Sequence, residues 1–209
     1  MAQKPEGKED LRVRRTRKLL QTALMELTVQ KGFEAVTVKD ICEQAMVNRA
    51  TFYRHYMDKY DLLDQYMEDL YGLLDQSQEE KDFDHPDGPP TGLVRMLEHL
   101  RGHADFYRAM LGLKGYPLFA ERIRFYIQKR MRQSLPANQA PSEPGQPPLD
   151  MMLRSVSSAG LGAISWWLEN DTPVTSEQMA AWAVQISNAL FLAKDTETKG
   201  NFPKHLEAD

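Results

Sequence analysis

The sequence has 209 residues, of which 42% are hydrophobic and 27% are charged, as is ordinary for a globular protein with a packed core. Its one cysteine, Cys42, excludes an intramolecular disulfide, and the cysteine spacing of a zinc site is missing. The N-terminus has no apolar segment of the kind that a signal peptide needs, and the uncharged residues 155–168 fall short of the roughly 20 that span a membrane. We therefore expect a cytoplasmic protein without membrane contacts.

Charge is distributed unevenly along the chain, although the net charge is only −4. Residues 1–60 carry 12 basic and 8 acidic side chains, whereas residues 61–209 carry 14 and 22. This asymmetry is typical of a basic binding module on an acidic body, but chance clustering of charges would give the same counts.

The first half of the chain predicts a series of helices. The apolar stripe of a first helix consists of Leu20, Ala23, Leu24 and Leu27. Three capping patterns follow, at Thr37 (with Asp40), Asn48 and Asp58, and each has an apolar residue before the cap that can act as a hydrophobic staple: Val36, Val47 and Met57. These patterns predict helices near 38–45, 49–55 and 59–75.

Two polar, proline-rich breaks divide the second half, at residues 76–92 and 136–148. Between and after the breaks, apolar spacing predicts helices near 93–103, 105–112, 117–134, 149–169 and 176–193. Thr175, with Gln178 three residues later, is expected to cap the last helix.

Residues 37–56 have the pattern of a helix–turn–helix motif. At 3.6 residues per turn, Phe52 and Tyr56 share one face of the second helix and can pack inward, whereas Arg49, Tyr53 and His55 lie towards the other face. A short helix of this kind can enter the major groove of DNA. Its outward side chains are donors that phosphates and base edges accept.

The stretch VNRATFYRHYMDKYDLL, residues 47–63, resembles the TetR/AcrR family of bacterial transcription regulators, and the similarity covers residues 14–63, about a quarter of the chain. Together with GLGAISWWLENDTPVTSEQMAAW near the C-terminus, it is most similar to the branch often described as Firmicutes-type. The resemblance implies an all-α fold with an N-terminal three-helix helix-turn-helix DNA-binding domain and a C-terminal helical dimerisation and effector domain. We accordingly expect a disordered arm (1–11), a DNA-binding domain (12–58, recognition motif 37–56), a regulatory and dimerisation domain (59–194) and a mobile tail (195–209).

The same resemblance implies which residues contact DNA. The second helix would contribute Thr37 and Lys39, and Lys59 would bind phosphate at the start of the fourth helix. The third helix would contribute Asn48, Arg49, Ala50, Thr51, Tyr53, Arg54 and His55.

Two features near this motif leave alternatives open. The basic run that includes Arg14, Arg15, Arg17 and Lys18 favours a flexible arm that reaches the minor groove, whereas for Arg12 we favour a solvated charge. Met46 stands in the turn where the family commonly has glycine, and a left-handed non-glycine residue costs roughly 1–2 kcal/mol. Either the turn is remodelled, or packing compensates for the cost.

The C-terminal body offers two weaker sites. Four residues of the middle helices could line an effector pocket: Phe106, Met110, Phe125 and Tyr126. Small residues recur every third position in the next helix, where a partner helix could approach closely, and with two tryptophans they give a dimer interface of Ser157, Gly160, Ala163, Trp167 and Trp182. His99 and His103 have the spacing of a metal-site edge but lack further ligands, so we expect no metal and no cofactor.

We therefore predict a transcriptional regulator that binds double-stranded DNA as a homodimer on a palindromic operator, most simply a repressor released by a small-molecule effector of unspecified identity. One alternative is a regulator or activator controlled by a protein partner. The other is a helical enzyme, but the sequence has no phosphate-binding loop, nucleophile elbow or HExxH pattern, so we expect no enzymatic activity.

Overall fold

The computed structural model describes residues 11–76, 88–112, 115–134 and 147–192, and every regular element within these ranges is helical, which confirms the predicted all-α fold. The elements are α1 (Leu11–Lys31), the 3-10 turn η1 (Phe33–Ala35), α2 (Val38–Gln44), α3 (Arg49–His55), α4 (Lys59–Gln76), α5 (Thr91–Gly102), α6 (Ala104–Leu111), α7 (Pro117–Ser134), α8 (Leu149–Glu169) and α9 (Ser176–Leu192). The limits predicted from periodicity and capping agree with these helices to within two residues.

Polar side chains cap the short N-terminal helices as the sequence predicts. Thr37 and Asp40 form the capping box of α2, with the Asp40 carboxylate accepting from the Thr37 N–H at 2.8 Å. Asn48 caps α3 and Asp58 caps α4 by accepting hydrogen bonds from backbone N–H groups of the first turn. One staple is wrong: the Met57 side chain is 79% exposed and does not pack at the start of α4.

A glycine directs the chain from α1 into η1. Gly32 has φ 80° and ψ 145°, a backbone conformation that is nearly restricted to glycine. It brings Phe33 back under α1, where the ring is 1% exposed. A side chain at position 32 would therefore strain the backbone at the point that places Phe33.

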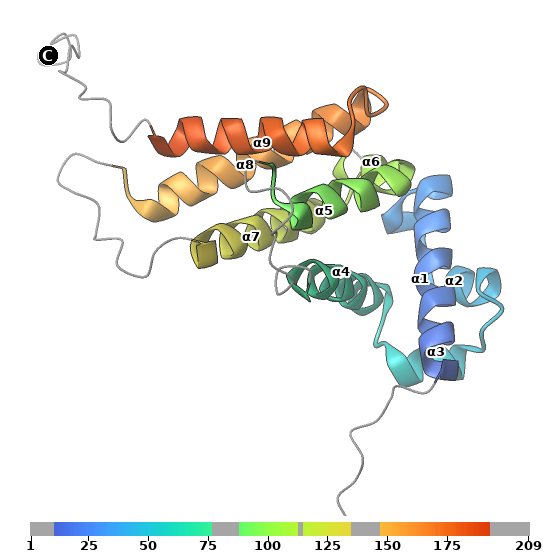
Figure 1. Cartoon of the computed structure of the whole chain (residues 1–209). Helices are drawn as coiled ribbons and strands as arrows, with labels where there is room; N and C mark the ends of the chain where they lie inside the picture. Colours follow the sequence, from blue (N-terminus) through green and yellow to red (C-terminus); the bar gives the residue numbers. More distant parts are fainter. Residues whose placement is uncertain (1–10, 77–87, 113–114, 135–146, 193–209) are drawn as a thin grey trace, which may run out of the picture.

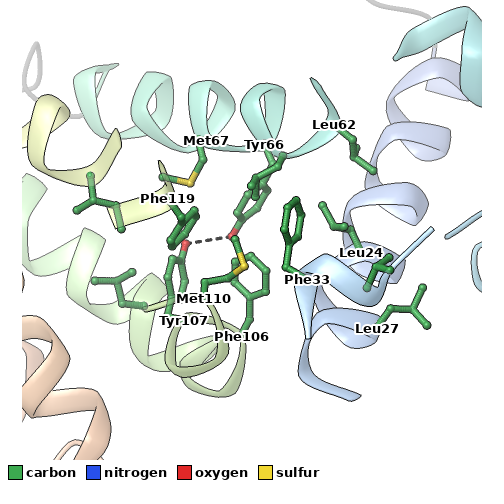
Figure 2. Packing of buried hydrophobic residues seen from close by; sticks show 14 of the residues in the cluster. Leu24, Leu27, Phe33, Leu62, Tyr66, Met67, Phe106, Tyr107, Met110 and Phe119 are labelled. Carbon is green, nitrogen blue, oxygen red and sulfur yellow. Dashed lines mark hydrogen bonds between the residues drawn. The ribbon is translucent and has the colours of Figure 1, made fainter. Parts of the chain in front are cut away.

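The helices form a head and a body. Figure 1 shows α1, α2 and α3 grouped in the head, α4 running from the head along one side of the body, and α8 with α9 on the opposite side. One hydrophobic cluster extends through both parts, from Leu24 and Phe33 in the head to Phe106 and Phe119 in the body (Figure 2). The predicted division at residue 58 thus separates helices that share one core, and it stays a prediction.

Most residues of the expected arm (1–11) and tail (195–209) lie outside the part of the chain that the structure describes. Residue Leu11 belongs to α1 and not to an arm, whereas residues 1–10 and 195–209 lie outside the described ranges. None of the described helices combines the length and apolar character that crossing a lipid bilayer requires.

Three polar groups meet inside the body between α4, α5 and α6. The Tyr66 hydroxyl lies 2.8 Å from His99 Nε2 and 3.1 Å from the Tyr107 hydroxyl, and the last two atoms are 3.1 Å apart. Burial, with a smaller effect of His103, lowers the pKa of His99 to about 4. A neutral imidazole therefore partners the two phenols, which explains how these groups are tolerated in an apolar core.

Candidate nucleic-acid interface

Helix α3 separates buried rings from exposed polar side chains. Phe52 is 0% exposed, and the C-cap residue Tyr56 is 3% exposed, with ring centroids 5.6 Å apart. Arg49, Tyr53 and Arg54 are exposed on the outer side of the helix. The predicted division of the helix is confirmed for Phe52, Tyr56, Arg49 and Tyr53, whereas His55 is half-buried. The buried face holds the outer face in a fixed orientation.

The remaining α3 residues of the predicted site are less uniform. Asn48 and Ala50 are exposed, whereas Thr51 and His55 are half-buried. The Asn48 carboxamide oxygen accepts from the Ala50 N–H at 2.8 Å, which leaves its NH₂ group to donate elsewhere. These four residues therefore differ in how much of their polar surface a ligand could reach.

The turn before α3 keeps its usual geometry although it lacks glycine. Met46 has φ 54°, and its side chain is 91% exposed. The Val47 N–H donates to the Cys42 carbonyl at 2.9 Å, and the Met46 N–H to the Glu43 carbonyl at 3.2 Å, which is the Schellman pattern. Remodelling is wrong, because Met46 adopts the left-handed conformation itself. Compensation by packing is wrong too, because the exposed Met46 side chain has almost no packing to offer.

The basic run near the N-terminus is helical, so the expectation of a flexible arm for Arg14, Arg15, Arg17 and Lys18 is wrong. Arg14, Arg15 and Lys18 are exposed in the first turns of α1, and Arg17 is half-buried. Figure 1 shows the start of α1 at the end of the head where α3 also lies. These cations are therefore presented by a rigid element of the head.

Thr37 and Lys39, which were predicted to contact DNA from the second helix, are both exposed, and each already contacts an acidic side chain. The Thr37 hydroxyl donates to the Asp40 carboxylate at 2.6 Å, and Lys39 lies 3.8 Å from Glu43. Hydrogen bonds from Lys31 and Thr37 hold the pKa of Asp40 well below its usual range. The Thr37 side chain thus has a structural role as the N-cap of α2.

Lys59 is a correction to the predicted site. Its side chain is buried, and its ammonium donates to the carbonyl oxygens of Phe33 and Glu34, each at 2.9 Å. The N-cap Asp58 already binds the backbone N–H groups of Tyr60 and Asp61. The expected phosphate contact of Lys59 is therefore replaced by a structural contact between α4 and η1.

The four residues proposed for an effector pocket do not converge. Phe106 and Met110 are buried in the main cluster, and Tyr126 stacks on Tyr71 with ring centroids 3.8 Å apart. Phe125 is 69% exposed, on a different side of α7. The four residues therefore do not form one pocket, because adjacent positions of α7 place the Phe125 ring outward and the Tyr126 ring inward.

The expected dimer interface is also mostly internal. The Ser157 hydroxyl accepts from the Gln128 amide at 3.0 Å, and a Cβ atom on Gly160 would meet Ile127 at 3.9 Å, so the small residues admit α7 of the same chain. Ala163 packs against the main cluster. Trp167 is 0% exposed, with its indole N–H donating to the Val174 carbonyl.

Another set of apolar residues, which periodicity did not single out, lies on the outside of α8 and α9. Besides Trp182 at 37% exposure, it comprises Trp166 (47%), Ile186 (41%) and Leu190 (43%). Residues 182, 186 and 190 recur every four positions and so lie on one face of α9. The spacing was available in the sequence, but which face looks outward depends on how α9 packs.

Comparisons with known protein families agree with this geometry. A family model described as "Bacterial regulatory proteins, tetR family" matches residues 20–66, and a model described as "Transcriptional regulator C-terminal region" matches residues 87–189. The first match runs from the middle of α1 into α4, and the second spans α5 to α8 and most of α9.

Two relatives from Bacillus subtilis (strain 168) are named as uncharacterized HTH-type transcriptional regulators. YvkB is 36% identical over 93 residues, which are 42% of this chain and 48% of that protein. YxbF is 42% identical over 55 residues, which are 26% of this chain and 14% of that protein. The chain thus spans about half the length of the first relative and much less of the second.

Solved structures share the fold over most of the chain. A TetR transcriptional regulator from Streptococcus agalactiae 2603V is 24% identical with a TM-score of 0.59, covering 85% of this chain and 96% of that one. A TetR regulator from Rhodococcus sp. RHA1 is 20% identical, with a TM-score of 0.55 and coverages of 88% and 98%. The dihydroxyacetone kinase operon activator DhaS is 18% identical, with a TM-score of 0.55 and coverages of 85% and 95%.

Proposed function

We propose that this chain, which belongs to the tetR family of bacterial transcriptional regulators, binds duplex DNA by placing α3 in the major groove. The observation that carries the proposal is the exposed face of α3, where Arg49, Tyr53 and Arg54 project from a helix fixed by Phe52 and Tyr56. An arginine on such a face can donate two hydrogen bonds to a guanine edge.

The start of α1 supports phosphate binding next to α3. Arg14, Arg15 and Lys18 lie in the first turns of α1, which has no acidic residue in its first turn. The N-terminal end of a helix carries a partial positive charge, so cations there are unfavourable unless an anion lies nearby. A DNA phosphate would supply that anion, and release of its counterions would strengthen binding.

A homodimer follows from the outward face of α8 and α9. Trp166, Trp182, Ile186 and Leu190 expose apolar surface on adjacent helices, and a second copy packed on this face by a two-fold axis would cover it. The two α3 helices would then meet successive major grooves, roughly 34–36 Å apart, on an inverted repeat. The protein would act in the cytoplasm and would need no enzymatic activity.

Regulation is proposed as repression that ends when a small effector binds the body. The head and the body share one hydrophobic cluster, so a rearrangement among α5 to α7 would alter the packing under α1 and α4. The dihydroxyacetone kinase operon activator DhaS, which shares the fold, is named as an activator, so the direction of regulation needs its own measurement. A reporter under the operator, with and without the protein, distinguishes repression from activation.

To test the proposed DNA binding, duplexes are selected from a random pool. The affinities of one arginine variant and one lysine variant for these duplexes are then compared with those of the original protein. Arg49→Ala should relax the preference for one base pair in each half-site, costing roughly 1–3 kcal/mol if its contact is bidentate. Lys129→Ala removes an exposed cation from the second half of α7, a helix of the body, and should change neither affinity nor base preference. Equal effects of the two substitutions on every duplex would contradict a base contact by Arg49.

A further inference from the structure

Three aromatic rings from distant parts of the sequence meet where the head joins the body. The ring centroid of Phe33 lies 5.4 Å from that of Tyr60 and 5.1 Å from that of Tyr116, and those of Tyr60 and Tyr116 are 5.4 Å apart. Each pair is within the range of a favourable aromatic contact. We call these three residues the junction cluster; it joins η1, the first turn of α4 and the segment before α7.

Polar contacts fasten two members of the junction cluster to each other. The Lys59 ammonium lies 4.8 Å from the Phe33 centroid and 5.1 Å from the Tyr60 centroid, within cation–π range. The Tyr60 hydroxyl and the Glu34 carboxylate are 3.1 Å apart, and the hydroxyl donates. The first turn of α4 is therefore fixed against η1 by rings, a cation and a hydrogen bond.

Tyr116 is the member of the junction cluster that belongs to the body, and the preceding residue, Gly115, determines its position. A Cβ atom on Gly115 would lie 2.0 Å from the Met110 carbonyl oxygen, so another residue could not be accommodated without moving the backbone. The Gly115 N–H donates to the Gly112 carbonyl at 2.8 Å. The close approach of this turn to the end of α6 holds the Tyr116 ring at the junction.

A second contact between the body and the start of α4 lies nearby. Arg122 of α7 forms an ion pair with Asp64 of α4, and both side chains are partly exposed. Exposed ion pairs contribute little to stability. Of the two contacts, the aromatic one at Tyr116 therefore contributes more to the packing of the body on the first turns of α4.

A short connection joins the junction cluster to the recognition helix. Helix α3 ends at His55 and α4 begins at Lys59, so the connection between them is short. We propose that Tyr116 is a positioning residue for DNA recognition: by packing on Phe33 and Tyr60 it holds the first turn of α4, and through it the tilt of α3. This inference rests on the proposed DNA-binding function, and Tyr116 itself contacts no DNA.

Two substitutions at this position test the inference with full-length protein and a selected operator. Tyr116→Ala removes the ring, and we expect the operator affinity to fall about 5- to 150-fold, the usual range of coupling between separate sites. The slope of log affinity against log salt should not change, because no phosphate contact is lost. Tyr116→Phe keeps the ring and should restore the affinity to within about twofold of the original, as small surface changes do.

Hydrogen exchange separates positioning from general destabilisation. In Tyr116→Ala, amide exchange should quicken in η1, α3 and the first turn of α4 but not in α8 and α9. Phe125→Ala removes an exposed ring from α7, the helix that directly follows Tyr116, and should leave both exchange and affinity unchanged. If the alanine variant does not fold, Tyr116→Leu, which keeps apolar volume without an aromatic face, takes its place.

These experiments distinguish failure of the positioning role of Tyr116 from failure of the DNA-binding proposal. If the unaltered protein binds no duplex, the DNA-binding proposal fails by itself. If it binds, and Tyr116→Ala or Tyr116→Leu retains the original affinity, the positioning role is overturned. A changed salt slope would also overturn it, because it would indicate that Tyr116 lies at the DNA.

Discussion

The ammonium group of Lys59 donates a hydrogen bond of 2.9 Å to the carbonyl oxygen of Phe33, which ties the first turn of α4 to the turn that follows α1. A second bond of the same length goes to the Glu34 carbonyl. A lysine that looks available for phosphate in the sequence is thus part of the junction between the head and the body.

Replacing Lys59 with methionine should therefore act on folding. Two buried or partly buried carbonyl groups would lose their donor, and leaving such groups unsatisfied costs about 1–3 kcal/mol. Urea unfolding followed by circular dichroism measures the loss. In DNA titrations, the slope of log affinity against log salt should be the same for the variant and the original protein. A slope lower by about 1 would show that Lys59 contacts a DNA phosphate.

Replacing Met46 with glycine should stabilise the protein. The left-handed backbone at Met46 costs a non-glycine residue roughly 1–2 kcal/mol, and the added freedom of glycine in the unfolded chain offsets about half of the gain. We expect the free energy of unfolding to rise by up to about 1 kcal/mol. The matched control is Met57→Gly, at the other end of α3, where the methionine is also exposed but φ is not positive; there stability should fall or stay the same. Equal changes in both variants would contradict the strain at Met46.

The His99 imidazole should make stability dependent on pH. The pKa of a histidine is ordinarily 6.5, and that of His99 in the folded protein is about 4, so the unfolded chain binds more protons between these values. The contribution is complete above pH 6.5 and is lost as the pH falls towards 4. His99→Gln should flatten the fall in melting temperature over this window, more than His103→Gln, because His103 is exposed. An identical fall with and without His99 would assign the acid sensitivity to other groups.

The sequence predicted most of the architecture because its signals are local. Capping at Thr37, Asn48 and Asp58 depends on side chains within one turn, and apolar spacing marks the inner face of each helix whatever lies opposite. For the same reason the buried and exposed faces of α3 were predicted correctly from Phe52 and Tyr53.

The errors concern which element lies opposite which. The stripe that includes Ser157 and Gly160 indicates close helix packing, but spacing cannot distinguish α7 of the same chain from a helix of a second copy. Phe125 and Tyr126 are adjacent in sequence and point to different sides of α7. Lys59 follows a helix cap, where the sequence cannot show that the backbone of η1 folds over it.

The outward face of α9 predicts the oligomeric state. Ile186→Glu places a charge in the middle of the proposed dimer interface, and burying an unpaired charge is strongly unfavourable. Light scattering coupled to gel filtration should show a dimer for the original protein at micromolar concentration and a monomer for this variant. The neighbouring exposed change Gln185→Glu adds the same charge at the edge of the face and should leave the dimer intact. A monomeric original protein would contradict the interface, as would a dimeric Ile186→Glu variant.

Methylation interference on a selected operator tests the central claim most directly, because it reports contact with guanine N7 in the major groove. If α3 enters the groove from each protomer of a dimer, methylated guanines should block binding in two clusters, with centres about 10 base pairs apart. Arg49→Ala should remove the interference at one guanine of each cluster and leave the others. Tight binding with no interference in the major groove, or no binding to any duplex in dilute salt, would contradict the account.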